Sequence, residues 1–207
     1  MIKKNLLAFL LICSVLPSFA QEEEEERRGF KKENLFSGGS IALSFFSGTF
    51  LVGGNPVLGY RVANWLDGGI VGNIQYMVIR DYGGIFDSRL KQFIYGGGLF
   101  TRIYPINFLF ATAQLEHNFI EIKFINPDGS SNPGDRYNTS ANSVLVGAGY
   151  ATGRAKEGNS PFFYFSIMWD ISGNENSPYT DGYGRSVPII RAGFNIPLFQ
   201  GGGGGGY

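Results

Sequence analysis

The segment Val187–Phe199 alternates strictly between apolar and polar or small side chains from Ile190 onward. The apolar positions are Ile190, Ala192, Phe194, Ile196 and Leu198, and they alternate with Arg191, Gly193 and Asn195. A period of two is typical of a β-strand whose two faces meet different surroundings. A soluble edge strand with so continuous an apolar face would promote aggregation, whereas a closed barrel in lipid needs that face and has no free edge. The segment therefore favours a membrane β-barrel.

Seven further segments of this kind precede it, and each ends in turn-forming residues. The eight strand-like segments are 39–46, 49–62, 65–80, 91–104, 109–122, 142–151, 162–172 and 187–199. Most of their connections alternate in length: the turns at 63–64 and 105–107 are short, and the loops at 82–90, 124–139 and 173–186 are long. Two connections depart from this pattern, since the first outer loop at 47–48 is very short and the turn at 152–160 is long. An even number of strands with short turns on the periplasmic side and long loops outside is typical of outer-membrane barrels.

These regularities predict an all-β fold, an eight-stranded antiparallel up-and-down transmembrane β-barrel over residues 36–199. A secreted soluble β-sandwich is the alternative, since it also uses short alternating strands. Two further segments flank the predicted barrel. Residues 21–35 form a charged N-terminal tail, and residues 200–207 form a glycine-rich C-terminal tail.

Residues 1–20 have the features of a secretory signal peptide. Lys3 and Lys4 precede the apolar run 6–16, and Ser18–Ala20 is a cleavage site with small residues at its two ends. The only cysteine, Cys13, lies inside the apolar run, so the mature chain has no disulfide and no thiol chemistry. The sequence predicts export, and with the barrel pattern it predicts the outer membrane of a Gram-negative bacterium.

Composition excludes several other classes of protein. Lysine plus arginine equals aspartate plus glutamate at 17 each, so no basic excess indicates a nucleic-acid partner. The 31 glycines show no three-residue period, which excludes collagen, and 15% aromatic residues fit an all-β protein with glycine at its turns. After the signal peptide no apolar run is long enough for a membrane-spanning helix.

Aromatic residues flank each predicted periplasmic turn, where their amphipathic rings would lie at the level of the lipid headgroups. The predicted membrane girdle consists of Tyr60, Trp65, Tyr104, Phe108, Tyr150, Phe162 and Phe199. A β-sandwich also uses aromatic residues, but it does not gather them at one end of its strands.

Charged residues occupy the inward positions of several predicted strands. These are Arg61, Arg102, Glu116, Asp170 and Arg191. The interior of an eight-stranded barrel is narrow enough to be filled by side chains, and charges removed from water need partners. We expect a structural network of salt bridges and hydrogen bonds in the lumen, and a proton or solute path through the lumen is the functional alternative.

Four stretches resemble the small outer-membrane β-barrels of the OmpA/OmpX-like kind, especially a single-barrel group common in Bacteroidetes. They are Pro56–Val62, Ile94–Arg102, Val144–Tyr150 and Ile190–Phe194, about half of the strands. The final strand also resembles the recognition signal of the barrel-assembly machinery, through Arg191, Gly193, Ile196 and Leu198. The resemblance implies that this machinery and outer-membrane lipid or lipopolysaccharide are partners.

Motifs for catalysis and cofactor binding are absent from the sequence. His117 is the only histidine, which excludes a multi-histidine metal site. Lipid A deacylase barrels carry a serine two residues after such a histidine, but Phe119 occupies that position here. We therefore predict no cofactor, no metal and no catalytic residues.

The sequence leaves three functions open. The first is a non-enzymatic barrel that is structural or binds a surface ligand or partner through its extracellular loops. For a periplasmic partner, the charged block 21–33 is the alternative contact site. The second is a narrow channel or carrier for a small solute, and the third is a lipid-modifying outer-membrane enzyme.

Overall fold

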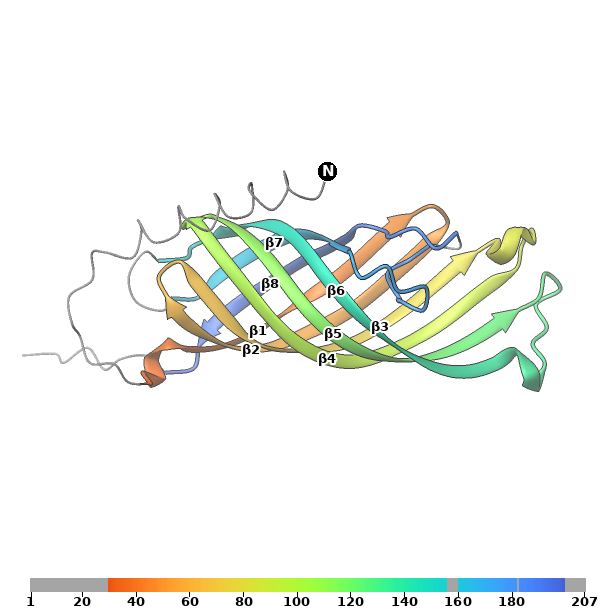
Figure 1. The fold of residues 1–207 in the computed structure, drawn as a ribbon, viewed down its shortest axis with the longest axis horizontal. Helices are drawn as coiled ribbons and strands as arrows, with labels where there is room; N and C mark the ends of the chain where they lie inside the picture. The colour runs from red at the N-terminus through yellow and green to blue at the C-terminus, as the bar shows by residue number, and fades with distance from the viewer. Residues whose placement is uncertain (1–29, 156–159, 182, 200–207) are drawn as a thin grey trace, which may run out of the picture. The chain divides into compact units, whose positions relative to one another are not determined.

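The computed structural model describes residues 30–155, 160–181 and 183–199. Eight antiparallel strands pair in chain order, and β8 pairs with β1, so the sheet closes into a barrel (Figure 1). The strands are β1 (Leu35–Phe46), β2 (Thr49–Ala63), β3 (Leu66–Arg80), β4 (Arg89–Ile106), β5 (Leu109–Ile125), β6 (Arg136–Thr152), β7 (Phe162–Asp170) and β8 (Ile189–Pro197). The predicted eight-stranded up-and-down barrel is confirmed.

Three predicted segments lie wholly or mostly outside the described residues. These are the signal peptide 1–20, the charged tail 21–35 up to residue 29, and the glycine-rich tail 200–207. The described end of the charged tail contains the short 3-10 helix η2 (Lys32–Asn34), and β1 begins directly after it. Within the described ranges no helix is both long and apolar enough to cross a membrane.

The two ends of the barrel differ in their connections. At the short-turn end, two residues connect β2 to β3 and two connect β4 to β5. At the long-loop end, the β3–β4 and β5–β6 hairpins extend beyond the β1–β2 turn (Figure 1). These two hairpins contain the 3-10 helices η3 (Tyr82–Gly84) and η4 (Pro133–Asp135), and residues 171–188 connect β7 to β8 at the same end.

The predicted loop 124–139 is too long. Strand β5 continues to Ile125 and β6 begins at Arg136, with Lys123 paired to Arg136 in register. The backbone ladder persists there although the outward side chains have become polar. Apolar alternation, the signal used to find strands, therefore ends before the strands themselves do.

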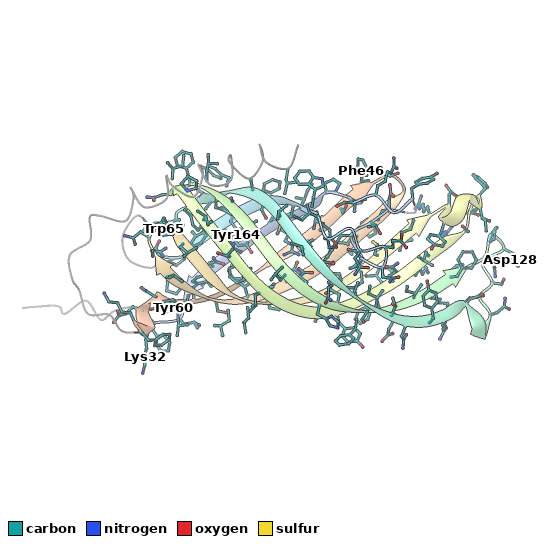
Figure 2. All side chains as sticks on the ribbon, viewed as in Figure 1. Lys32, Phe46, Tyr60, Trp65, Asp128 and Tyr164 are labelled. Atoms are coloured by element: carbon teal, nitrogen blue, oxygen red, sulfur yellow. The ribbon has the colours of Figure 1, made fainter. Side chains whose placement is uncertain are left out.

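Alternate side chains point into the barrel and away from it, as the pleat of a strand requires (Figure 2). Every strand places large apolar side chains on the outer surface. The interior is filled by three apolar clusters with polar layers among them. Beginning at the long-loop end, representative members are Leu51, Ile94 and Tyr179, then Phe36 and Val57, then Tyr104 and Phe162.

Candidate functional site

All five charged side chains predicted to face the lumen are buried inside the barrel, and none is more than 7% exposed. They are Arg61, Arg102, Glu116, Asp170 and Arg191. The structure places them at three levels: Asp170 is linked to Glu116 and Arg191 through Ser177 and Tyr179, whereas Arg61 and Arg102 lie nearer the short-turn end. Only Glu116 and Arg191 contact each other, at the middle level, where the Arg191 guanidinium lies 3.1 Å from the Glu116 carboxylate.

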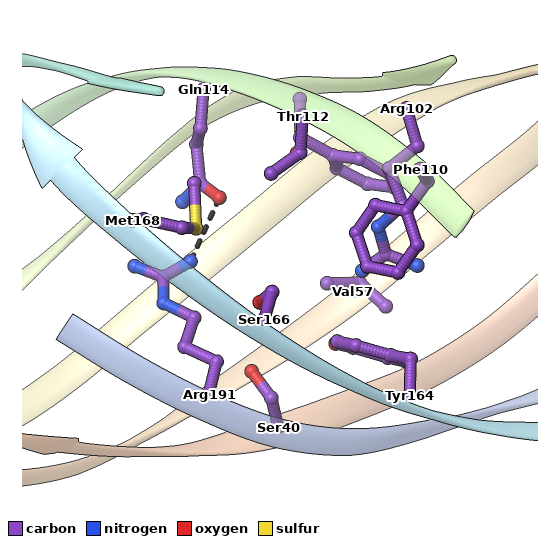
Figure 3. A pocket seen from close by; sticks show the side chains of 11 residues that line it. Ser40, Val57, Arg102, Phe110, Thr112, Gln114, Tyr164, Ser166, Met168 and Arg191 are labelled. Atoms are coloured by element: carbon purple, nitrogen blue, oxygen red, sulfur yellow. Dashed lines mark hydrogen bonds between the residues drawn. The ribbon is translucent and has the colours of Figure 1, made fainter. Parts of the chain in front are cut away.

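Glu116 is the centre of the middle level. Its Oε1 accepts hydrogen bonds from Arg191 Nη2 and Gln114 Nε2, and its Oε2 accepts from Asn118 Nδ2 and the Tyr179 hydroxyl. Arg191 Nη1 also donates to Gln114 Oε1 at 2.8 Å (Figure 3). Four donors to one buried carboxylate offset much of the cost of removing its charge from water.

Three asparagines extend this level across the lumen. Asn55 Nδ2 donates to Asn73 Oδ1 and Asn73 Nδ2 donates to Asn118 Oδ1, both at 2.7 Å. Asn73 and Asn118 are on strands that do not pair directly, since each is in register with Gly96 of β4. A Cβ on Gly96 would lie 2.7 Å from Asn118 Oδ1, so the missing side chain leaves room for the two amides to meet.

The level at the short-turn end is organised by Asp67, which is completely buried. Its carboxylate lies 3.1 Å from the Arg154 guanidinium and 4.0 Å from Arg61 Nε. Arg154 follows β6, donates to the Asn64 carbonyl at 2.8 Å and lies 3.7 Å from the centre of the Tyr104 ring. Arg102 stacks on a different ring, 4.1 Å from the centre of Tyr164.

The level at the long-loop end connects Asp170 to the loop 171–188. Asp170 Oδ1 accepts from the backbone amides of Val144 and Ser172, and its other oxygen accepts from the Ser177 hydroxyl. The loop then turns inward, so that Tyr179 is completely buried and reaches Glu116. Asp170 thus helps to hold a loop that closes this end of the lumen.

Asp181 stabilises the outer part of the same loop. Its carboxylate accepts from the backbone amides of Tyr183 and Arg185 and from the Arg185 side chain. Burial raises the pKa of Asp181, but these hydrogen bonds lower it by more, so its pKa lies below the usual range for aspartate. Arg185 also donates to the Ser47 hydroxyl at 2.9 Å, which ties the loop to the β1–β2 turn.

The predicted aromatic girdle is wrong at two of its seven positions, Tyr104 and Phe162. Tyr104 and Phe162 are each only 3% exposed and pack inside the barrel. Tyr104 has the same inward parity as Arg102 on β4, and Phe162 the same parity as Tyr164 on β7. Both lie next to a predicted periplasmic turn, but the face of the strand, and not the distance to a turn, decides which side a ring occupies.

The other five girdle residues have rings that are not enclosed in the barrel. Trp65, Phe108, Tyr150 and Phe199 are exposed on the outer surface, and Tyr60 is half-buried. Tyr60 and Trp65 lie at the short-turn end (Figure 2), and the Phe108 and Tyr150 rings contact each other at 5.9 Å between centres. The position of these rings relative to a bilayer remains a prediction.

His117 lies on the outer surface, on the outward face of β5. Its Nδ1 is 2.7 Å from Asn142 Oδ1, and its ring meets the edge of Phe119 at 4.9 Å between centres. In the described part of the chain, no group of three histidine, cysteine, aspartate or glutamate side chains is arranged to hold a metal ion.

Sequence reasoning missed several important lumen residues. Asp67 had a usable signal, because it shares the inward parity of Asn73 and Gln75 on β3. Arg154 and Tyr179 had none, since both lie in connections where the two-residue period does not apply.

No protein-family model and no curated protein sequence matches the chain. Three small outer-membrane barrel proteins of known structure are similar in fold. The N-terminal β-barrel domain of Pseudomonas aeruginosa OprF shares 14% identity over 79% of this chain and 96% of its own, with a TM-score of 0.42. Yersinia pestis Ail, solved in complex with the heparin analogue sucrose octasulfate, shares 12% sequence identity over 78% of this chain and 96% of its own, with a TM-score of 0.41. Acinetobacter baumannii CarO2 shares 14% sequence identity over 78% of this chain and 97% of its own, with a TM-score of 0.40.

Proposed function

We propose that this protein is a non-enzymatic β-barrel of the Gram-negative outer membrane that binds a ligand or partner through its outer hairpins. The observation that carries the proposal is the distribution of polarity. Large apolar side chains cover the outside of every strand, while charged pairs such as Glu116 and Arg191 are buried within. A soluble barrel or sandwich has the opposite distribution, because water meets its outer surface.

The height of the apolar surface supports insertion in a bilayer. On β5 the outward positions from Leu109 to Phe119 carry apolar side chains, apart from His117. This stretch of roughly ten residues, at about 3.4 Å each and tilted by about 40°, spans about 26 Å, close to the apolar band of about 25 Å in outer-membrane barrels. We assign the short-turn end to the periplasm and the long-loop end to the cell exterior.

The filled lumen favours binding over transport. Between Arg102 and Arg191 a cavity of about 10 Å³ remains, which is roughly the space for one water molecule. Tyr179 and its loop occupy the lumen nearer the exterior. The outer hairpins then provide the exposed surface on which a ligand or partner would bind.

Conductance in planar bilayers tests this proposal. We expect refolded protein to insert without discrete ion steps, because side chains fill the lumen at all three levels described above. Heat-modifiable gel mobility of the same sample identifies refolded barrel, which excludes absent protein as the reason for a silent bilayer. Reproducible ion steps from refolded protein would overturn the binding role in favour of a narrow channel.

A further inference from the structure

Five basic side chains gather on the outer surface at the long-loop end of β3 to β6. We call them the basic row: Arg80, Arg89, Lys91, Lys123 and Arg136. They are direct neighbours across strands. Arg80 is in register with Arg89, Lys91 with Lys123, and Lys123 with Arg136. Three consecutive strand pairs, β3–β4, β4–β5 and β5–β6, thus place like charges directly opposite one another.

This arrangement costs stability unless an anion neutralises it, since like charges directly opposite on a sheet repel. The nearby acids are few. Asp87 lies 3.4 Å from Arg89, and Glu121 shares the outward face of β5 with Lys123. Among the described residues, no carboxylate lies within 4.0 Å of the charged nitrogens of Lys91, Lys123 or Arg136.

Two hollows on the outer surface combine these cations with aromatic rings. One, of about 280 Å³, is lined by Lys91, Lys123 and Arg136 together with the rings of Tyr76 and Phe93, and the carboxylate of Glu121 also lines it, which leaves three cations to one anion. The other, of about 270 Å³, is lined by Arg80, Arg89 and Lys91 together with Phe50 and Tyr76. Both volumes lie just below the usual range for small-molecule pockets, and each hollow has room for a phosphate group.

The apolar surface begins directly beside the basic row. On β4 the next outward side chains after Lys91 are Phe93 and Tyr95, and Tyr95 stacks on Phe119 at 5.6 Å between ring centres. A molecule that meets both features needs an anionic group attached to an apolar body. On the other side of the barrel, the corresponding ends of β1, β7 and β8 carry Phe45, Trp169 and Ile190 instead of basic residues.

We propose that the basic row binds the phosphate groups of a lipid in the outer leaflet, the phosphorylated lipid A part of lipopolysaccharide, while its acyl chains lie on the aromatic surface below. Arginine and lysine beside an apolar surface neutralise such phosphates and keep their stems in contact with lipid. This inference rests on the proposed insertion in the outer membrane. It adds a specific lipid site on one side of the barrel.

Native mass spectrometry of the refolded full chain in neutral detergent, titrated with diphosphorylated lipid A, tests the site. The triple variant Lys91→Ala, Lys123→Ala, Arg136→Ala is expected to bind about a hundredfold more weakly, since each basic side chain near an anionic lipid surface strengthens binding by about fivefold. The control Lys32→Ala removes a basic residue at the opposite end and should bind like the unaltered protein.

Further measurements separate a failure of the lipid A site from a failure of the proposed insertion in the outer membrane. Inorganic phosphate should not compete with lipid A, and equal binding of free phosphate would replace the lipid site with a site for the bare anion. Equal lipid A affinity in the triple variant and the unaltered protein would overturn the site. Heat-modifiable mobility and insertion in vesicles are measured on the same preparations: an inserted protein without lipid A preference refutes only this inference, whereas failure to insert refutes the proposed function as well.

Discussion

Replacing Glu116 by alanine is expected to destabilise the barrel by about 3–5 kcal/mol. The carboxylate accepts four hydrogen bonds and is the only carboxylate that pairs with Arg191 among the described residues. Without it, a guanidinium only 3% exposed would remain buried with an amide as its partner. The urea midpoint of unfolding in detergent, followed by the fluorescence of Trp65 and Trp169, measures the loss.

Two control variants make this result specific. Glu121→Ala removes a carboxylate from the outward face of the same strand and should change stability by less than about 0.5 kcal/mol. The double variant Glu116→Met, Arg191→Met buries no unpaired charge, so it should recover most of the stability. Equal midpoints for Glu116→Ala and Glu121→Ala would contradict the role of the buried pair.

Adding a single methyl group at Gly98 is expected to have a comparable effect. Gly98 is on the inward face of β4, in register with Glu116. An ideal Cβ there would lie 1.7 Å from the Leu115 carbonyl oxygen, and backbone atoms cannot move aside as a side chain would. We expect Gly98→Ala to cost at least about 3 kcal/mol, because the two strands would have to separate.

Gly54→Ala is the matched control for this substitution. Gly54 lies in β2 on the outward face, and its Cβ would meet no atom within 4 Å. The measurement is the fraction of heat-modifiable barrel after refolding in detergent, which should fall sharply for Gly98→Ala and stay unchanged for Gly54→Ala. Similar yields for both variants would show that the close approach at Gly98 does not limit folding.

The strands were predictable because one physical contrast repeats along the chain. Lipid-facing and lumen-facing positions alternate, so the period of two located all eight strands and placed Arg61, Arg102, Glu116, Asp170 and Arg191 inside. The predicted girdle was wrong at Tyr104 and Phe162, because closeness to a turn was used there instead of the face of the strand. The predicted strands also ended too early in β5 and began too late in β6, where the outward face is polar but the backbone pairing continues.

The contacts inside the lumen were less predictable than the strands, because they join residues from distant parts of the chain. Tyr179 reaches Glu116 over 63 residues and Arg154 reaches Asp67 over 87 residues. Tyr179 and Arg154 both lie in connecting segments, and the paths of these segments depend on the closed barrel rather than on local sequence. The basic row was hidden for a related reason, since its residues are adjacent only once the register between strands is known.

A nitroxide scan along β5 in lipid vesicles tests the central claim most directly. In a Cys13→Ser background, single cysteines at 111, 113 and 115 carry outward labels, and cysteines at 112 and 114 carry inward labels. We expect the outward labels to collide with lipid-soluble oxygen and not with a water-soluble nickel chelate, and the inward labels to be shielded from both. Outward labels that are open to the nickel chelate would contradict a transmembrane barrel.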